Sequence, residues 1–298
     1  MMLCASCGIA EVDDIKLKEC DDCDLVRYCS DACQELHRPE HAGKCRKRAA
    51  ELRDEILFKQ PESNHFGDCP ICCLPVPIDE QQTVFMTCCS KRICLGCIYT
   101  NQEREIKGRL QQKCPFCREP APDRYEEHNR RLMKRIEAND PAAMCEMGAD
   151  IYNEGHYDSA FKYYSRAAAL GNVLAHYHLS TSYREGQGVE KNEKKHVYHA
   201  EKAAIAGHPE ARYNLGCTEE QRGSFDRAAK HYIIAAKLGD DDSLRRVKDL
   251  YQSGIVNKDD FTAALRGYQT AINATKSPQR EEAAEYAKCH LSSERGSR

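Results

Sequence analysis

The sequence predicts small α+β modules stabilised by metal ions, followed by an all-α solenoid of helix–turn–helix repeats. Two observations carry this prediction. Of the 19 cysteines, 16 lie before residue 118, among prolines and short loops. After about residue 120, Ala, Leu, Tyr and charged residues recur with helical periodicity, and similar segments return every 32–36 residues. A chain of 298 residues is long enough for two or three such domains.

The cysteines have two explanations, disulfides and metal-bound thiolates. A disulfide-rich protein needs an oxidising compartment and usually a signal peptide. The first cysteine is Cys4, so we expect no apolar leader ahead of it, and an odd total argues against complete pairing. We therefore predict metal-bound thiolates and a cytoplasmic and/or nuclear location.

Charge and hydropathy argue against two classes of partner. The formal net charge is −3 and there is no long basic run, so no nucleic-acid partner is expected. No run of 18 apolar residues exists, so no membrane span is expected. The cysteine spacing also differs from that of base-reading zinc fingers, and basic recognition helices are missing, so a transcription factor is the weakest interpretation.

The first cysteine group offers eight ligands in four pairs, which is enough for two tetrahedral zinc sites. The pairs are Cys4-x2-Cys7, Cys20-x2-Cys23, Cys29-x3-Cys33 and His41-x3-Cys45. His37 is an alternative to His41 as a ligand. We prefer His41, because the His-x3-Cys spacing places both side chains on one face of a helix.

The segment YCSDACQELHRPEHAGKC, residues 28–45, resembles a MYND finger. In that family the ligand pairs interleave. The resemblance implies one zinc on Cys4, Cys7, Cys29 and Cys33, and another on Cys20, Cys23, His41 and Cys45. It also implies a protein-interaction module, often for proline-rich peptides. The family commonly has tryptophan three residues before its histidine, and Arg38 stands there in this chain, which puts the peptide groove in doubt.

A second cysteine group follows the pattern C-x2-C, x15, C-C, x4, C-x2-C, x16, C-x2-C. Its three Cys-x2-Cys pairs are a strong signal for a metal. The pattern resembles the RING family, whose zinc sites also interleave. The resemblance implies one zinc on Cys69, Cys72, Cys94 and Cys97. It implies a second on Cys114, Cys117 and two ligands from the central loop.

The central loop TCCSKRICLGC leaves these last two ligands open. A histidine-type RING would use Cys89 and the position of Lys91, but a protonated lysine has no lone pair to give. The all-cysteine variety has four residues between its fourth and fifth ligands, as between Cys89 and Cys94, and Cys88 is then the third ligand. We predict Cys88 and Cys89 as the pair, which requires a twisted backbone. Four zinc ions per chain follow, and Cys73 is left as a free thiol.

Three residues of this module match positions that contact the ubiquitin-conjugating enzyme in RING proteins. Such modules hold the ubiquitin-charged conjugating enzyme in a productive pose, which is catalysis by positioning. The resemblance implies that Ile71 and Pro115 contact this enzyme and that Arg118 bridges both partners as a linchpin. Alternatively, Ile71 is core, Pro115 shapes a turn and Arg118 is a solvated charge. All three in register favour ligase activity, although enzyme activity stays uncertain on sequence alone.

The helical half repeats itself with two helices in each unit. The aligned segments are AFKYYSRAAALGN (160–172), HVYHAEKAAIAGH (196–208), AAKHYIIAAKLGD (228–240) and ALRGYQTAINATK (264–276). Their paired alanines allow helices to approach closely, and Gly171, Gly207 and Gly239 suit left-handed C-caps. About residues 139–276 resemble the Sel-like subtype of tetratricopeptide repeat. The fourth segment departs most, since Thr275 replaces its glycine.

These observations predict an adaptor of three modules. Its expected parts are a MYND-type finger (1–48), a helical linker (49–66), a RING-type finger (67–120), a linker helix (121–138), a solenoid (139–290) and a disordered tail (291–298). Its partners are expected to be proteins: a conjugating enzyme, a client of unknown identity and proline-rich peptides. The hypotheses are a RING-type ubiquitin ligase and, as the alternative, a non-catalytic scaffold.

Overall fold

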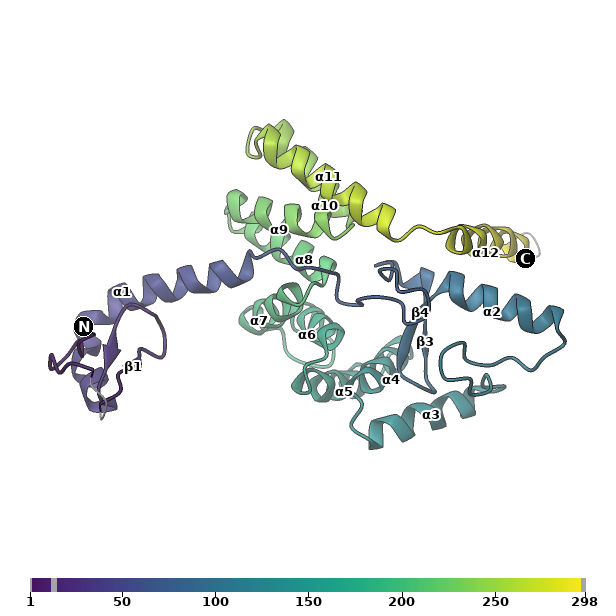
Figure 1. Cartoon of the computed structure of the whole chain (residues 1–298), viewed down its shortest axis with the longest axis horizontal. Helices are drawn as coiled ribbons and strands as arrows, with labels where there is room; N and C mark the ends of the chain where they lie inside the picture. Colours follow the sequence, from purple (N-terminus) through teal and green to yellow (C-terminus); the bar gives the residue numbers. More distant parts are fainter. Residues whose placement is uncertain (1, 12–14, 296–298) are drawn as a thin grey trace. The chain divides into compact units, whose positions relative to one another are not determined.

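The structure is a computed structural model that describes residues 2–11 and 15–295, with side chains described as far as Lys288 (Figure 1). The chain separates between Lys59 and Gln60 into two compact units. The first unit holds the first cysteine group. The second holds the second cysteine group together with the helical repeats, so these two parts share one unit although the sequence predicts them as separate domains.

The first unit is a short hairpin followed by one long helix. Its elements are β1 (Lys18–Glu19), β2 (Arg27–Tyr28), which pairs antiparallel with β1, and α1 (Asp31–Leu57). Ser30 caps α1, and its hydroxyl accepts a hydrogen bond from the N–H of Cys33 at 3.3 Å. The helix is continuous through the boundary expected at residues 48 and 49, because nothing in the sequence there ends it.

Cysteines make up most of the core of the first unit. Leu17 and Tyr28 are the buried apolar residues that join them. The buried cysteines of this cluster are Cys4, Cys20, Cys23 and Cys45. A core with so little hydrocarbon gives little hydrophobic stabilisation, so the fold of this unit depends on what the cysteines bind.

The second unit begins with a small α+β module. Its elements are the 3-10 turn η1 (Glu80–Gln82), the antiparallel strands β3 (Thr83–Met86) and β4 (Lys91–Cys94), and helix α2 (Leu95–Lys107). Val76, Ile93 and Ile98 are buried here among the cysteines. Ser90 has a φ of +53°, which lets the chain turn sharply between the doubled cysteine and β4.

Helices make up the rest of the second unit. They are α3 (Tyr125–Glu137), α4 (Pro141–Asn153), α5 (Tyr157–Ala169), α6 (Val173–Glu185), α7 (Glu193–Ile205), α8 (Pro209–Gln221), α9 (Phe225–Lys237), α10 (Asp241–Gln252), α11 (Lys258–Ala274) and α12 (Pro278–Arg295). From α4 to α10 each helix packs on the next, and α11 packs on both α9 and α10. No helix in the described part of the chain is both long and apolar enough to cross a membrane.

Small residues opposite tyrosines set the helix spacing in two of the repeats. A Cβ on Gly148 would lie 2.6 Å from the ring of Tyr164, and a Cβ on Gly216 would lie 2.5 Å from Tyr232. Glycine is therefore required in α4 and α8 for the tyrosines of α5 and α9 to be buried. The C-cap prediction is confirmed, since Gly171, Gly207 and Gly239 all have positive φ.

Helix α12, which lies within the range of 139–290 predicted for the solenoid, packs on a helix of the cysteine-rich module. It packs along α2 of the cysteine-rich module, where the rings of Tyr99 and Tyr286 lie 4.9 Å apart (Figure 1). Gly96 permits this contact, because a Cβ there would lie 2.8 Å from the side chain of Arg280. Helix α12 ends at Arg295, and residues 296–298 of the predicted tail (291–298) lie outside the described residues.

Candidate metal centres

The structure brings the sixteen predicted ligands together in four groups of four. Within each group the ligand atoms all lie within 4.8 Å of one another. The groups are Cys4–Cys7–Cys29–Cys33, Cys20–Cys23–His41–Cys45, Cys69–Cys72–Cys94–Cys97 and Cys88–Cys89–Cys114–Cys117. With Zn–S bonds of about 2.3 Å, tetrahedral geometry requires sulfur atoms about 3.8 Å apart, whereas a disulfide requires about 2.05 Å.

Both groups of the first unit fit a tetrahedral zinc ion. In the first group the Sγ atoms of Cys7 and Cys29 are 3.5 Å apart, and those of Cys29 and Cys33 are 3.6 Å apart. In the second group all four residues are buried, and the Sγ atoms of Cys20 and Cys45 are 3.8 Å apart. These separations match zinc and are too long for disulfides.

His41 is the fourth ligand of the second group, and His37 is not a member of it. The Nε2 atom of His41 lies 3.2 Å from Sγ of Cys23. His37 instead forms a hydrogen bond of 3.0 Å between its Nδ1 atom and the hydroxyl of Tyr28. Arg38 points into solvent and pairs with Glu35 at 3.4 Å, so the position where tryptophan is usual carries an exposed charge.

The second unit holds the other two groups, including the doubled cysteine. The Sγ atoms of Cys72 and Cys94 are 3.8 Å apart. In the remaining group, Cys89 lies 3.9 Å from Cys114, and Cys88 lies 3.3 Å from Cys117. Both sulfur atoms of the doubled cysteine therefore reach one group. Lys91 is exposed on β4 and takes no part.

Three of the Cys-x2-Cys pairs share one backbone turn. In each, the N–H of the first cysteine donates to the carbonyl five residues on, as from Cys69 to Leu74 at 2.9 Å. The residue after the second cysteine has positive φ in all three turns: 74° at Gly8, 54° at Cys73 and 65° at Arg118. In the turns of Cys4 and Cys69, backbone N–H groups of the turn lie close enough to the sulfur to stabilise its thiolate form.

A cation is needed to hold these crowded thiols as thiolates. Burial, followed by neighbouring sulfur atoms, raises the pKa of Cys88 well above its ordinary value, and burial raises the pKa of Cys89 to about 11. A zinc ion supplies the positive charge that offsets this cost. Each group gives four protein ligands and so forms a closed site, whose role is to fix loops rather than to activate water.

Two arginines from the helical part contact the ligand loops. The guanidinium of Arg280 on α12 donates to Sγ of Cys72 at 3.3 Å and to the carbonyl of Pro75 at 2.7 Å. The guanidinium of Arg135 on α3 donates to the carbonyl of Cys88 at 2.6 Å. One helix before the solenoid and one after it therefore hold opposite halves of the module.

A third link joins β4 to the first solenoid helix. Arg92 donates to the hydroxyl of Thr83 at 3.0 Å, lies 4.6 Å above the ring of Phe66 and is 3.7 Å from Glu146 on α4. Burial raises the pKa of Glu146 to about 7. This partly desolvated pair fixes the module against the base of the solenoid.

The residues predicted to contact a conjugating enzyme lie on two equivalent turns. Ile71 is 40% exposed although it stands between two ligands, so it is not a core residue. Its counterpart in the other turn is Phe116, which is 43% exposed and was missed from the sequence. Pro115, beside it, is half-buried. The motif CPFC (114–117) could have predicted the exposure of Phe116, because a large apolar side chain between closely spaced ligands has little room to point into the core.

Arg118 is anchored at its base and exposed at its tip. Its side chain is 52% exposed and lies 4.0 Å from the buried carboxylate of Glu105. It also donates to Oδ1 of Asn101 at 3.2 Å. The amide of Asn101 donates to the carbonyl of Lys113 at 3.1 Å, and the carboxylate of Glu105 accepts from the N–H of Lys113 at 3.1 Å, so α2 orients the turn that carries Arg118.

The histidines of the helical part form no further group of three or more ligands among the described residues. His176 and His199 share a hydrogen bond of 2.9 Å between their Nδ1 atoms. His65 and His208 stack with ring centroids 4.1 Å apart. Burial lowers the pKa of His65 to about 3 and also lowers that of His208, so these rings pack as neutral groups.

Comparison with known proteins identifies two of the modules. The family described as MYND finger matches residues 4–45, and the Sel1 repeat matches residues 141–172, 173–208 and 209–240. The chain thus carries a MYND finger and three Sel1 repeats, and the fourth predicted segment, residues 264–276, lies beyond the matched repeats. The helices α10 and α11 extend the stack beyond the matched segments.

One curated relative and two solved structures resemble the chain over part of its length. Chitin synthase regulatory factor 4 of Schizosaccharomyces pombe is 31% identical over 113 residues, which cover 36% of this chain and 18% of that protein. A Sel1 repeat protein from Oxalobacter formigenes is 27% identical, with a TM-score of 0.43 over 52% of this chain and 66% of that one.

The second solved structure is c5321, a protective antigen of uropathogenic Escherichia coli with an SLR fold. It is 23% identical, with a TM-score of 0.41 over 49% of this chain and 33% of that one. The chain spans less than two thirds of each of these relatives. The family matches therefore describe a zinc finger followed by helical Sel1 repeats.

Proposed function

We propose that residues 67–120 form a RING-type ubiquitin ligase module, which holds a ubiquitin-charged conjugating enzyme while the solenoid and the MYND finger bind the target. The observation that carries the proposal is the exposure of Ile71 at 40% and of Phe116 at 43%, at equivalent places in two zinc-binding turns. An apolar pair kept on the surface by metal-fixed turns is suited to contact another protein.

The conformation of Arg118 supports the same function. A non-glycine residue with a φ of +65° carries a conformational cost of about 1–2 kcal/mol. At the matching position of the first unit the residue is Gly8, which avoids that cost. The third matching position, Cys73, also has a positive φ, of +54°, so the strain at Arg118 supports a role only together with its exposed side chain. Its exposed guanidinium has donors to spare for carbonyl groups of two partners.

The proposed mechanism uses this chain only to position its partners. Ile71, Pro115 and Phe116 would bury apolar surface of the conjugating enzyme. Arg118 would donate hydrogen bonds across its contact with ubiquitin, which restrains the thioester carbonyl for attack by a client lysine. No residue of this chain forms a covalent intermediate. The zinc ions keep the two turns in the conformation that exposes these side chains.

The test is a reconstituted reaction with activating enzyme, a panel of conjugating enzymes and ubiquitin. Wild-type protein is expected to form ubiquitin chains with at least one conjugating enzyme. Arg118→Ala and Ile71→Ala are expected to reduce the rate by about tenfold or more, as losses near 1.4 kcal/mol predict. Absence of chains across the whole panel would exclude the ligase and leave a non-catalytic adaptor.

Two matched controls separate a lost contact from a lost fold. Ile106 is 64% exposed near the C-terminal end of α2, and the exposed Lys107 beside it pairs with Glu103 at 3.0 Å. Ile106→Ala and Lys107→Ala are expected to keep wild-type rates. All four variants should bind four zinc ions by native mass spectrometry. Equal losses in the test and control variants would contradict the assigned surface.

We further infer that the adaptor works in the cytoplasm or the nucleus, where thiols stay reduced. The 18 cysteines with described side chains form no disulfide, and sixteen ligands depend on the thiolate or neutral imidazole form. The MYND finger is proposed to bind proline-rich peptides through a surface altered by Arg38. Fluorescence anisotropy with a proline-rich peptide tests this, and Arg38→Trp is expected to tighten binding.

A further inference from the structure

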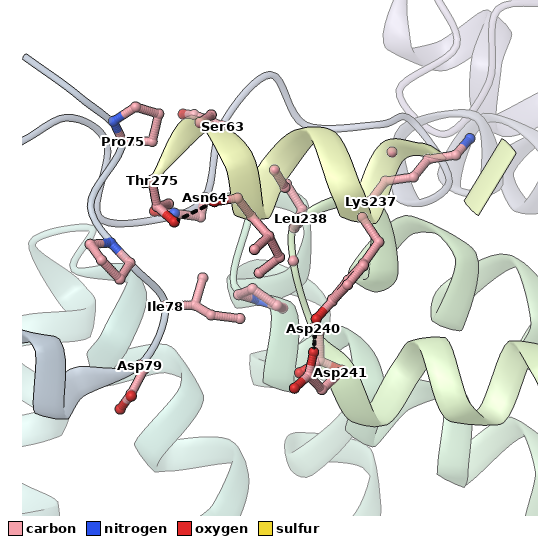
Figure 2. Close-up of a pocket in the computed structure, with 18 of the residues that line it drawn as sticks. Ser63, Asn64, Pro75, Ile78, Asp79, Lys237, Leu238, Asp240, Asp241 and Thr275 are labelled. Atoms are coloured by element: carbon pink, nitrogen blue, oxygen red, sulfur yellow. Dashed lines mark hydrogen bonds between the residues drawn. The ribbon is translucent and has the colours of Figure 1, made fainter. Parts of the chain in front are cut away.

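A groove of about 1210 Å³ lies in the second unit between the zinc module and the solenoid. One wall is the chain leading into and out of the first zinc-binding turn, residues 60–65 and 75–79. The other is built from α8, the turn between α9 and α10, and α11 with the start of α12. Figure 2 shows Ile78 from the first wall and Leu238 and Asp241 from the second. Neither wall alone encloses the groove.

The walls are held together by contacts that leave little freedom. The N–H of His65 donates to the carbonyl of Gly207 at 3.0 Å. A Cβ on Gly207 would lie 2.5 Å from the carbonyl oxygen of Ser63, so only glycine allows the wall to come this close. The amide of Asn64 donates to the carbonyl of Val76 at 2.8 Å, which ties the two segments of the first wall to each other.

Arg280 links the zinc-binding turn to this groove. That side chain lines the groove and donates to the carbonyls of Leu74 and Pro75 at 3.2 and 2.7 Å, as well as to Sγ of the ligand Cys72. The segment that follows the zinc-binding turn is thereby fixed in place as one side of the groove. The groove is preformed, which lowers the entropic cost of binding.

The size and lining of the groove indicate the kind of ligand. Drug-sized ligands occupy pockets of about 300–1,000 Å³, so this groove has room for several residues of a peptide. Its lining contains apolar side chains such as Pro77, Ile78 and Ile272. Proline and β-branched side chains of this kind suit an extended segment, which presents alternate side chains to a surface.

Its charge is negative. Seven carboxylates line the groove against four cationic side chains; among them, Arg280 contacts the zinc-binding turn, Asp240 caps α10 and Asp242 pairs with Arg245. Among the described residues, the carboxylates of Glu62 and Glu281 have no ion-pair or hydrogen-bonding partner, and they come from opposite walls. An occupant with lysine or arginine side chains would satisfy both.

We propose that this groove docks an extended basic segment of a partner protein. The wall contributed by the zinc module makes docking depend on zinc, and it places the bound segment beside the turn that carries Ile71. The proposal rests on the adaptor role and not on ligase activity. Peptide binding needs no conjugating enzyme, so a failure of either proposal is seen separately.

The test is a selection from a random library of displayed ten-residue peptides against the zinc-loaded full chain. Selected peptides are expected to be enriched in Lys and Arg, and to bind more weakly as salt is raised. Glu62→Lys combined with Glu281→Lys is expected to weaken the selected peptides by about tenfold or more, as loss of two charge contacts predicts. Glu62→Gln with Glu281→Gln gives a milder version if the reversed charges disturb folding.

The control is an equal charge change away from the groove. Glu126 and Glu137 on α3 are exposed and do not line it. Glu126→Lys with Glu137→Lys is expected to leave the affinity unchanged. The proposal is overturned if no peptide is enriched, if acidic peptides are selected, or if the α3 variant weakens binding as much as the groove variants do.

Discussion

The two zinc modules use the same ligand chemistry in different settings. In the first unit, the hairpin and α1 surround two metal groups and a core in which Leu17 and Tyr28 are the buried apolar residues. In the second unit, the module is joined to the helical part by Arg135, Arg92 and Arg280. The first is a fold held mainly by its metal ions, and the second is a fold held by metal ions and by a solenoid.

This difference teaches what zinc contributes in each place. Where little apolar surface is buried, binding energy for the metal is nearly all of the folding energy. Where helices also contact the ligand loops, removing the metal lowers the stability of those helices as well. The damage caused by removing zinc should therefore stay local in the first unit and spread in the second.

The largest effect is expected from removing one buried ligand in each unit. Cys20→Ser should abolish the fold of the first unit and leave the unfolding of the helical part unchanged. Cys69→Ser should release the zinc of its group and lower the stability of the second unit by about 3–5 kcal/mol, because a buried ligand and its packing are lost. Native mass spectrometry and circular dichroism at 222 nm, which suits a chain without Trp, measure the two results.

The results for Cys20→Ser and Cys69→Ser together test whether the effect of zinc loss stays local in the first unit and spreads in the second. If Cys69→Ser leaves the helical transition where it is in the wild type, then the arginine contacts do not couple the module to the solenoid. If Cys20→Ser lowers that transition, then the first unit is not energetically separate.

A smaller effect is expected from cutting one of the contacts while keeping zinc. Arg280→Met keeps most of the apolar stem but removes the donors to Cys72, Leu74 and Pro75. We expect the second unit to lose about 2–3 kcal/mol, since several partly buried acceptors lose a charged donor. Urea unfolding measures this, with Arg266→Met, an exposed position on α11, as the control. Equal losses in both variants would show that the contact is not specific.

Acid should weaken the second unit through His65. The folded ring stays neutral down to about pH 3, whereas the unfolded chain takes up a proton near pH 6.5. Stability is therefore complete above pH 6.5 and falls as the pH drops below it, by about 2 kcal/mol from this residue at pH 5.

Replacing His65 by phenylalanine should remove this dependence. Both ring nitrogens of His65 are buried without a hydrogen-bonding partner, so His65→Phe should cost little at pH 7 and should flatten the decline by about 2 kcal/mol at pH 5. Zinc release in acid affects the wild type and the variant equally. Urea unfolding at pH 7 and pH 5 measures the difference, and the exposed His156 serves as control in His156→Phe. An unchanged decline would contradict the assignment.

The smallest effect is expected from removing one helix N-cap in each unit, which tests whether the two units unfold separately. Ser30→Ala removes the N-cap of α1 and should destabilise the first unit by about 1 kcal/mol. Asn172→Ala removes the N-cap of α6, where Oδ1 accepts from Ala175 N at 2.8 Å, and should destabilise the second unit by a similar amount. Hydrogen exchange followed by mass spectrometry should place each loss in its own unit. Spread of either loss into the other unit would argue for coupling.

Much of this fold follows from local chemistry that a sequence displays. Helix periodicity and a glycine after each repeat predict the helical pairs, since the left-handed C-caps at Gly171, Gly207 and Gly239 depend only on neighbouring residues. The grouping of the ligands came from family resemblance, which carries the interleaved arrangement that spacing alone leaves open. The structure then places His41 with the cysteines and His37 against Tyr28.

The parts that could not be predicted depend on contacts between distant residues. Arg280 and Cys72 are 208 positions apart, and nothing near either one indicates the other. Helix α12 has helical composition like its neighbours, so its docking on α2 is decided by Gly96 and Tyr99, which lie in another module. The doubled cysteine was undecided because the backbone turn at Ser90, rather than the spacing, directs the two sulfur atoms.

The left-handed residue after each zinc-binding turn has a consequence for how this protein could evolve. At Arg118 the backbone favours glycine, so Arg118→Gly is a mutation that stabilises the module while it deletes the exposed guanidinium. Selection for stability alone would therefore erode this site. As long as arginine persists there, selection must act on what its side chain does, and a descendant that has lost its partner should revert to the relaxed turn seen at Gly8.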